Sequence, residues 1–305
     1  MTFRLLEASM RRIVLACGLL ALGWLSLTVA AQRGGQDQPK VVEVDKIKDN
    51  LYVLKGGGGN TAVFLTSNGV AVVDTKNPGW GPPLLEKIKS ITNKPITTII
   101  NTHTHGDHTS GQMEFAGVTA EVVTHDNTKA NMAKLEPYKK PENAKWLPKR
   151  TFNDKMTLLS GNDRIDLYYF GRGHTNGDAW VVFPALGVVH AGDLFAGKNV
   201  PLVDFGNGGS GAAYPDTLTK AYNGIKNVDT IITGHSNTTM KWDDLKEFAD
   251  FNRDFLSWVR SQQKAGKSSE QAAGEYKVPD RFKGYTANLP PFFGGMKGYI
   301  QGIYD

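Results

Sequence analysis

Cysteine is almost absent from this sequence, and its scarcity excludes two kinds of chemistry. The single cysteine among 305 residues, Cys17, lies in an apolar N-terminal run, so the remainder of the chain has neither a disulfide nor a thiolate ligand. A strong excess of one charge is also missing, because 35 Lys and Arg face 30 Asp and Glu. The formal net charge of +5 is too small to predict a nucleic-acid partner. Internal repeats and interdomain linkers are missing too, which favours one globular domain.

Long apolar runs occur only at the N-terminus. Arg11 and Arg12 precede an apolar run from Ile13 to about Ala31, and the run ends in the small residues of LTVAAQ. This layout is typical of a secretory signal. We therefore predict a signal peptide over residues 1–31, a flexible leader over 32–41 and a mature domain over 42–305, exported to the periplasm or secreted. An uncleaved membrane anchor is the alternative, because the run is just long enough to span a bilayer.

Short apolar runs separated by turn residues follow the leader. Their spacing predicts strands over residues 50–55, 60–69, 70–75, 96–101, 120–125, 164–170, 178–183, 187–193 and 229–235. Helical spacing predicts helices over residues 81–91, 214–225 and 242–266. Strands followed by helices, twice over, predict an α/β fold of two packed sheets with helices outside. We expect the lysine-rich stretch 129–150 to be a solvated loop, and the four glycines of KGGGGN to allow movement or close approach to a ligand.

Histidine is also scarce, with seven in the chain, yet three of them fall in the stretch IINTHTHGDHTSG. His103, His105, Asp107 and His108 directly follow a predicted buried strand, where loops gather reactive residues on a rigid scaffold. If the segment is extended, alternating side chains point His103, His105 and Asp107 the same way. A cluster this dense in imidazole and carboxylate predicts a metal site.

Further ligands are expected after later strands. His174, Asp193 and His235 each follow a strand-like run and have glycine beside them. All the ligand atoms are then imidazole nitrogen or carboxylate oxygen. This set suits zinc and, less often, iron or manganese.

These motifs and their order resemble the metallo-beta-lactamase superfamily over residues 42 to about 260. The chain carries H-x-H-x-D-H, the GHT-x-GD histidine, the AGD aspartate and the late GH. The resemblance implies a four-layer αββα sandwich of two mixed sheets flanked by helices. It also implies two zinc ions. The first would be held by His103, His105 and His174, and the second by Asp107, His108 and His235. Asp193 would bridge the two.

Two further residues are expected to support the ligands. Asp74 closes a strand at the position of a family aspartate, and we assign it a supporting role behind the ligands. His190 alternates with core residues just ahead of Asp193. It is either a core histidine or a partner of that aspartate.

The resemblance implies hydrolysis of a small-molecule amide, ester or thioester by a metal-bridging hydroxide, with Asp107 orienting it and moving its proton. The bridging aspartate is the pattern of glyoxalase II-like hydrolases. A beta-lactamase proper is the alternative, because the stretch after Asp193 resembles the lactamase loop and offers Lys198, Asn207 and Tyr214 as substrate contacts. An iron-dependent persulfide-type dioxygenase and a non-enzymatic metal-binding module are further alternatives, disfavoured by the complete ligand set. No stable membrane association is expected after cleavage of the signal.

Overall fold

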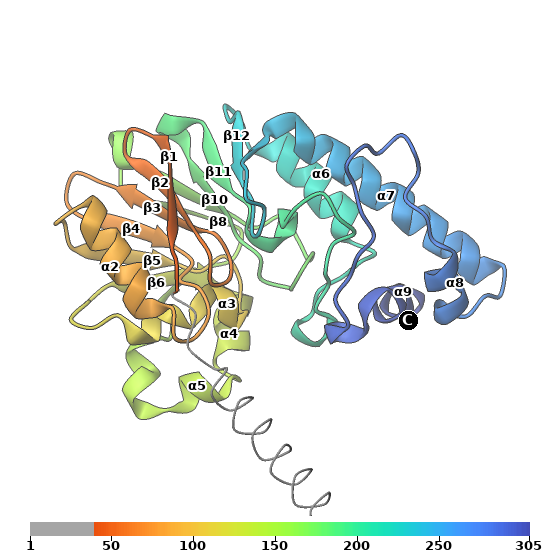
Figure 1. Ribbon diagram of the computed structural model, residues 1–305, viewed down its shortest axis with the longest axis horizontal. Coiled ribbons are helices and arrows are strands. Elements are labelled where there is room, and N and C mark those ends of the chain that lie inside the picture. Colours follow the sequence, from red (N-terminus) through yellow and green to blue (C-terminus); the bar gives the residue numbers. More distant parts are fainter. Residues whose placement is uncertain (1–39) are drawn as a thin grey trace, which may run out of the picture. The chain divides into compact units, whose positions relative to one another are not determined.

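The computed structural model describes residues 40–305. The predicted signal peptide and most of the leader lie outside the described residues. From Val41 to Asp305 the chain forms one compact unit. Its two sheets pack face to face, with helices on the outside (Figure 1). The predicted α/β architecture, two mixed sheets flanked by helices, is confirmed.

Within residues 40–305, the first sheet has seven strands arranged in chain order. Its first half, β1 to β4, is antiparallel, and its second half, β4 to β7, is parallel. The strands are β1 (Glu43–Lys48), β2 (Leu51–Lys55), β3 (Thr61–Leu65), β4 (Val70–Val73), β5 (Ile96–Ile100), β6 (Glu121–His125) and β7 (Arg150–Phe152). Because Val73 lies beside Ile100 in the parallel half, the loops after β4 and β5 leave the sheet at the same edge.

The second sheet has six strands within the same described range, in the order β13-β12-β11-β10-β9-β8. Only the β11–β12 pair is parallel; its neighbours are antiparallel. The strands are β8 (Lys155–Leu158), β9 (Ile165–Tyr168), β10 (Trp180–Phe183), β11 (Val188–His190), β12 (Thr230–Ile232) and β13 (Met240–Lys241). His190 lies beside Ile232, so the loops after β11 and β12 also leave from one edge.

Eight α-helices lie outside the two sheets in the described part of the chain. They are α2 (Gly81–Ile91), α3 (Gly106–Thr109), α4 (Asp126–Met132), α5 (Glu136–Lys139), α6 (Tyr214–Gly224), α7 (Trp242–Lys264), α8 (Ser269–Glu275) and α9 (Gly295–Tyr304). α2 buries Leu84, Leu85 and Ile88 against the first sheet, as its helical spacing predicts. None of the helices between residues 40 and 305 is both long and apolar enough to cross a membrane.

Apolar side chains fill the space between the sheets. Phe64 of β3 and Phe183 of β10 meet there with ring centroids 5.0 Å apart. A second core lies between the second sheet and α6 and α7, where Leu218 and Phe248 are buried. These layers are the physical basis of the sandwich, because each sheet face is covered by apolar side chains.

The lysine-rich stretch 129–150 differs from its prediction as a solvated loop. Its lysines are largely exposed, but the segment contains α5 and is held by the buried side chains of Tyr138 and Trp146. The Tyr138 hydroxyl donates to the carbonyl of Thr109 at 3.0 Å. These aromatic anchors make the stretch part of the folded body beside α3.

Candidate metal centre

All the sequence-predicted ligands lie on loops or short helices that follow strands. His103 and His105 lie after β5, where the chain bends and then enters α3, which carries Asp107 and His108. The segment is therefore not extended throughout, and simple alternation of side chains does not describe it. His174 follows β9, Asp193 lies in the short helix Gly192–Phe195 after β11, and His235 follows β12.

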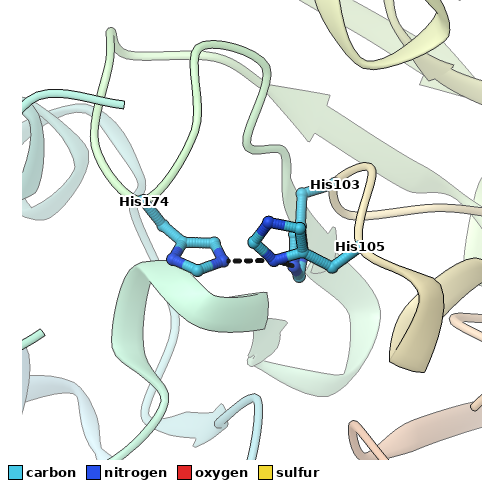
Figure 2. A group of neighbouring side chains, drawn as sticks. All are labelled: His103, His105 and His174. Atoms are coloured by element: carbon cyan, nitrogen blue, oxygen red, sulfur yellow. Dashed lines mark hydrogen bonds between the residues drawn. The ribbon is translucent and has the colours of Figure 1, made fainter. Parts of the chain in front are cut away.

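Three histidines form the first group of candidate ligands. The Nε2 atoms of His103 and His174 lie 3.2 and 2.9 Å from Nδ1 of His105. Figure 2 shows the three rings turning their nitrogens toward one another, with His103 and His105 on one loop and His174 on another. These ligand atoms all lie within 4.8 Å of one another, which is a separation that one cation can span.

The opposite ring nitrogens of this group are held by other groups. His174 Nδ1 donates to the carbonyl of Leu202 at 2.7 Å, and His105 Nε2 lies 2.8 Å from a carboxylate oxygen of Asp204. His103 Nδ1 lies 3.0 Å from the Thr102 hydroxyl. Such partners fix the orientation of each ring and raise its basicity as a ligand.

Asp107, His108 and His235 form the second group. Nε2 of His108 lies 3.3 Å from Nε2 of His235, and both nitrogens lie within 3.6 Å of the Asp107 carboxylate. Whereas His108 is fully buried, the side chains of Asp107 and His235 are 30% and 39% exposed. The second group therefore forms the open side of the centre.

Asp193 lies between the two groups. One of its carboxylate oxygens is 3.4 Å from His108 Nε2, and the other is 3.6 Å from His174 and 3.3 Å from His235. Its buried Oδ1 has no hydrogen-bond partner within the described chain. A buried carboxylate oxygen without a donor is costly in a protein interior, and a cation at this point would satisfy it.

The electrostatics of the centre suit a divalent cation. Burial, with the neighbouring imidazoles, holds the pKa of His103 well below its usual range, and burial also lowers the pKa of His174. Burial alone raises the pKa of Asp193, but His235 and His108 outweigh it and hold that pKa well below the usual range. His103 and His174 are therefore neutral beside an ionised carboxylate, as zinc ligands must be. Although burial lowers it, Asp193 and Asp74 raise the pKa of His108 to about 10, and Asp193 raises the pKa of His235. A cation in place of those protons would satisfy the same carboxylates, so the residues present fit a metal ion.

Asp74 supports the second group through its contact with His108. It follows β4 directly, is fully buried, and accepts hydrogen bonds from the Thr102 amide, the Thr102 hydroxyl and His108 Nδ1 at 2.7 to 2.8 Å. Its φ of 61° is unusual for a residue with a side chain. This backbone turn aims the carboxylate at His108, in the supporting position that the sequence predicts.

Lys76 is a buried charge that the sequence analysis did not identify. Its ammonium group donates to the carbonyls of Leu54 and Gly59 at 2.8 and 3.0 Å. Burial lowers the pKa of Lys76 from 10.5 to about 7, although Asp74 acts in the opposite direction. Lys76 thereby ties the glycine loop after β2 to the body of the first sheet.

The glycine loop approaches His108 closely. A Cβ atom on Gly59 would overlap the imidazole ring of His108, and the amide of Gly59 donates to the Asp107 carbonyl at 3.0 Å. Only glycine fits such a backbone approach. The close approach that KGGGGN allows is therefore directed at a candidate ligand.

His190 is held on both sides by the backbone. Its Nε2 donates to the carbonyl of Asn60 at 3.0 Å, and its Nδ1 accepts from the Gly192 amide at 3.1 Å. This buried ring positions the turn that carries Asp193. Of the two roles expected, the contacts favour a core histidine with its hydrogen bonds satisfied.

Two of the three residues predicted to contact substrate have other contacts. Lys198 donates to Asp244 and Glu247 of α7 at 2.8 and 3.2 Å, so its charge is already paired. Tyr214 is fully buried and its hydroxyl donates to the Asp193 carbonyl at 2.9 Å. Within the protein, Lys198 thus stabilises a helix contact and Tyr214 supports the Asp193 backbone; their assignment as substrate contacts stays a prediction.

Asn207, the third of these residues, acts through Asp204. Its side-chain amide donates to Asp204 Oδ2 at 2.6 Å, and the same oxygen lies beside His105. Hydrogen bonds from His105 and Asn207 outweigh burial and lower the pKa of Asp204 to about 2. Asp204 was missed because its partner His105 is 99 positions away in the chain; the local sequence VDFGN indicates only a capped turn.

The sandwich of two mixed sheets, with histidines and aspartates gathered at the loops between them, defines a metallo-hydrolase class of fold. The family model for the metallo-beta-lactamase superfamily matches residues 54–235. The chain belongs to this superfamily.

Named relatives agree with this assignment. The chain is 29% identical over 266 residues to a metallo-beta-lactamase type 2 from Elizabethkingia meningoseptica, covering 81% of this chain and 96% of the relative. It is 26% identical over 214 residues to a metallo-beta-lactamase type 2 from Bacillus cereus, covering 66% and 78% of the two chains.

Solved structures share the fold. A metallo-beta-lactamase from Pontibacter korlensis superposes with a TM-score of 0.58 at 21% identity, covering 70% of this chain and 99% of that one. The sec-alkylsulfatase Pisa1 from Pseudomonas sp. gives a TM-score of 0.69 at 14% identity, covering 87% of this chain and 50% of that one. At these identities the similarity extends to the fold alone.

Proposed function

We propose that this protein is an exported, dinuclear zinc hydrolase that cleaves a small-molecule amide, ester or thioester. The position of Asp193 carries the proposal, because its carboxylate lies within 3.6 Å of histidines from both ligand groups. Membership of the metallo-beta-lactamase superfamily supports a hydrolase. The N-terminal signal pattern supports export.

The two ions would be held by seven side chains: His103, His105 and His174 for the first, Asp107, His108 and His235 for the second, and Asp193 between them. Two divalent cations held there would supply a water of lowered pKa and would polarise a carbonyl oxygen. Iron or manganese would accept the same donors. Metal analysis of the purified protein distinguishes the three.

The protein's own residues then have separate tasks. Asp107, which is partly exposed, takes the proton that the attacking water loses and returns it to the leaving nitrogen, oxygen or sulfur atom. Asp74 and Asp204 hold His108 and His105 in place. No covalent link between enzyme and substrate is required.

A beta-lactamase proper is the second candidate. Metallo-beta-lactamases type 2 are among its relatives, and export suits such a role. However, Lys198 is already paired with Asp244 and Glu247, which weakens the support for the anion contact that the lactamase hypothesis used. We therefore keep lactams as one substrate group among several. The complete second ligand group argues against a one-metal dioxygenase and against a non-enzymatic metal-binding module.

A hydrolysis screen tests the proposal. Zinc-loaded protein is assayed against lactams, lactones, thioesters and phosphodiesters, with Asp107→Asn as the matched variant. We expect turnover of at least one carbonyl substrate and a fall in kcat of about 100-fold or more in Asp107→Asn, because general acid–base groups contribute about 10²–10⁴-fold. Absence of turnover on every carbonyl compound by the zinc-loaded protein would contradict the proposal.

A further inference from the structure

The C-terminal segment brings two phenylalanines to the metal centre. The ring of Phe293 stacks on His105, with centroids 5.7 Å apart and planes 24° apart. Phe292 meets Phe293 edge to face at 5.6 Å. A residue almost 190 positions after the first histidine cluster thus covers one side of a candidate ligand.

Both rings are unusually exposed for aromatic side chains. Phe292 and Phe293 are 57% and 47% exposed. Large apolar groups in water are unfavourable, and among residues 40–305 the other large apolar side chains that are exposed are Val41, Val44 and Leu159. The only exposed phenylalanines of the described chain therefore lie next to the centre, which points to a ligand that covers them.

The segment holds the rings in place from both sides. Before them, Asn199 donates to the Asn288 carbonyl at 2.7 Å and accepts from the Thr286 hydroxyl at 2.7 Å. After them, α9 buries Tyr299, whose ring packs on Phe255 of α7 at 5.2 Å. The rings are thus attached to the same loop region that leads to Asp204, and not to a free tail.

The local backbone is shaped to present Phe293. Two prolines precede the pair, and two glycines with φ of 83° and 57° follow it. Phe293 itself has a φ of 58°, which is disfavoured for a residue with a large side chain. Such outliers cluster at binding and active sites, so the conformation is consistent with a role in binding.

We propose that Phe293, with Phe292 behind it, forms an apolar wall of the substrate site and recognises a flat or hydrocarbon group attached to the reacting carbonyl. The inference rests on the proposed function. The opposite side of the centre is polar, with Asp107 and His235 partly exposed. A fitting substrate therefore has a polar carbonyl end at the two ligand groups and an apolar end against Phe293.

Binding of two hydroxamates tests the wall without turnover. Acetohydroxamate and benzohydroxamate carry the same metal-binding group, and only the second has a ring. Their dissociation constants are measured by calorimetry on zinc-loaded protein, with zinc content determined for each sample. The variants are Phe293→Ala, Phe293→Leu and, as a matched loss of an exposed apolar side chain elsewhere, Leu159→Ala.

In the wild type we expect benzohydroxamate to bind more tightly than acetohydroxamate by about 3- to 10-fold, the range of one aromatic contact. Phe293→Ala should remove this preference, Phe293→Leu should keep part of it, and Leu159→Ala should keep all of it. Acetohydroxamate affinity should stay the same in all four proteins.

Two outcomes overturn the inference and can be told apart. A zinc-loaded Phe293→Ala protein that keeps the full preference overturns the wall alone. If, in addition, the wild type sediments as a dimer and this variant as a monomer, the rings belong to a contact between copies. A wild-type protein that holds no zinc overturns the proposed function and the wall with it.

Discussion

Asp204 makes the centre depend on a side chain that is not itself a candidate ligand. It lies 2.8 Å from His105 Nε2, is almost fully buried, and also accepts from Asn207. Its negative charge favours the tautomer of His105 that leaves Nδ1 free to face His103 and His174. The first group is therefore a unit of three histidines and one aspartate.

We expect Asp204→Asn to weaken zinc binding at the first group by roughly 10-fold, because loss of such a supporting partner costs about 10–100-fold. Competition with a chromophoric chelator measures the affinity. Asp229→Asn, at an exposed aspartate just before β12, is the matched control. Equal zinc affinity in both variants would show that Asp204 only caps its turn.

Lys76 should make the free energy of unfolding depend on pH. Its pKa is about 7 in the folded protein because of burial, and about 10.4 in an unfolded chain. Between these values the unfolded chain binds the proton and the folded chain does not, so this residue makes the free energy of unfolding rise with pH, by up to about 1.4 kcal/mol per pH unit. Below pH 7 the stabilising increment is absent.

Lys76→Met should remove this slope. Urea unfolding of the wild type and the variant at pH 7, 8 and 9, both with chelator, gives the difference in free energy of unfolding. We expect the wild type to gain on the variant as pH rises, because the other titrating groups are common to both proteins. Parallel pH profiles would contradict a buried lysine with a lowered pKa.

At the scale of elements, the loop between β2 and β3 packs closely against α3. Gly59 packs its backbone against the ring of His108 and receives the Lys76 ammonium on its carbonyl. Gly59→Ala should therefore lower the free energy of unfolding by about 1–3 kcal/mol, the usual cost of overpacking, and weaken metal binding at the second group.

Gly274→Ala is the matched control for that experiment. Gly274 lies in α8, and a Cβ atom there would meet nothing within 4 Å. Alanine at this position should leave metal binding unchanged and stabilise the helix by up to about 1 kcal/mol. Thermal and urea unfolding with metal titration compare the two variants. A Gly59→Ala protein that behaves like Gly274→Ala would show that the loop can move away from His108.

The elements that could be predicted from sequence are those with a clear apolar period. Buried strands such as β4 and β5, and the amphipathic α7, occur where the pattern predicts them. The pattern did not predict β13, which has two residues, or α9, whose sequence GMKGYIQGIY contains three glycines. Glycine disfavours a helix interior; in α9, burial of Tyr299 and Ile300 compensates.

The candidate site also contains residues that the sequence could predict and residues that it could not. Its histidines and aspartates form dense local motifs, so a sequence pattern can find them. Asp204, Lys76 and Phe293 act through partners that are far away in the chain, and only the folded structure brings them together. Lys198 and Tyr214 show the reverse case, in which a local resemblance indicated substrate contacts but packing gave these side chains other partners.

For the whole molecule, metal binding should stabilise the fold, because both sheets contribute candidate ligands. Two zinc ions per chain are expected. Free zinc at about 100 times the dissociation constant of one site adds about 2.7 kcal/mol to the free energy of unfolding. That corresponds to a rise of roughly 5 °C in Tm for a chain of this size. Calorimetry with and without chelator, beside elemental analysis, measures both quantities. His235→Ala should retain about one zinc and part of the shift; an unchanged Tm on metal removal would contradict this prediction.

The order of the ligands along the chain has a consequence for the timing of assembly during synthesis. The seven strands of the first sheet are complete at Phe152. The first ligand group, which is His103, His105 and His174, is complete once His174 has been made. Asp193 and His235 come later, from the turns after β11 and β12. A nascent or truncated chain ending before His235 therefore carries one whole ligand group and only part of the other, so we expect the two ions to be acquired in sequence as the second sheet docks onto the first.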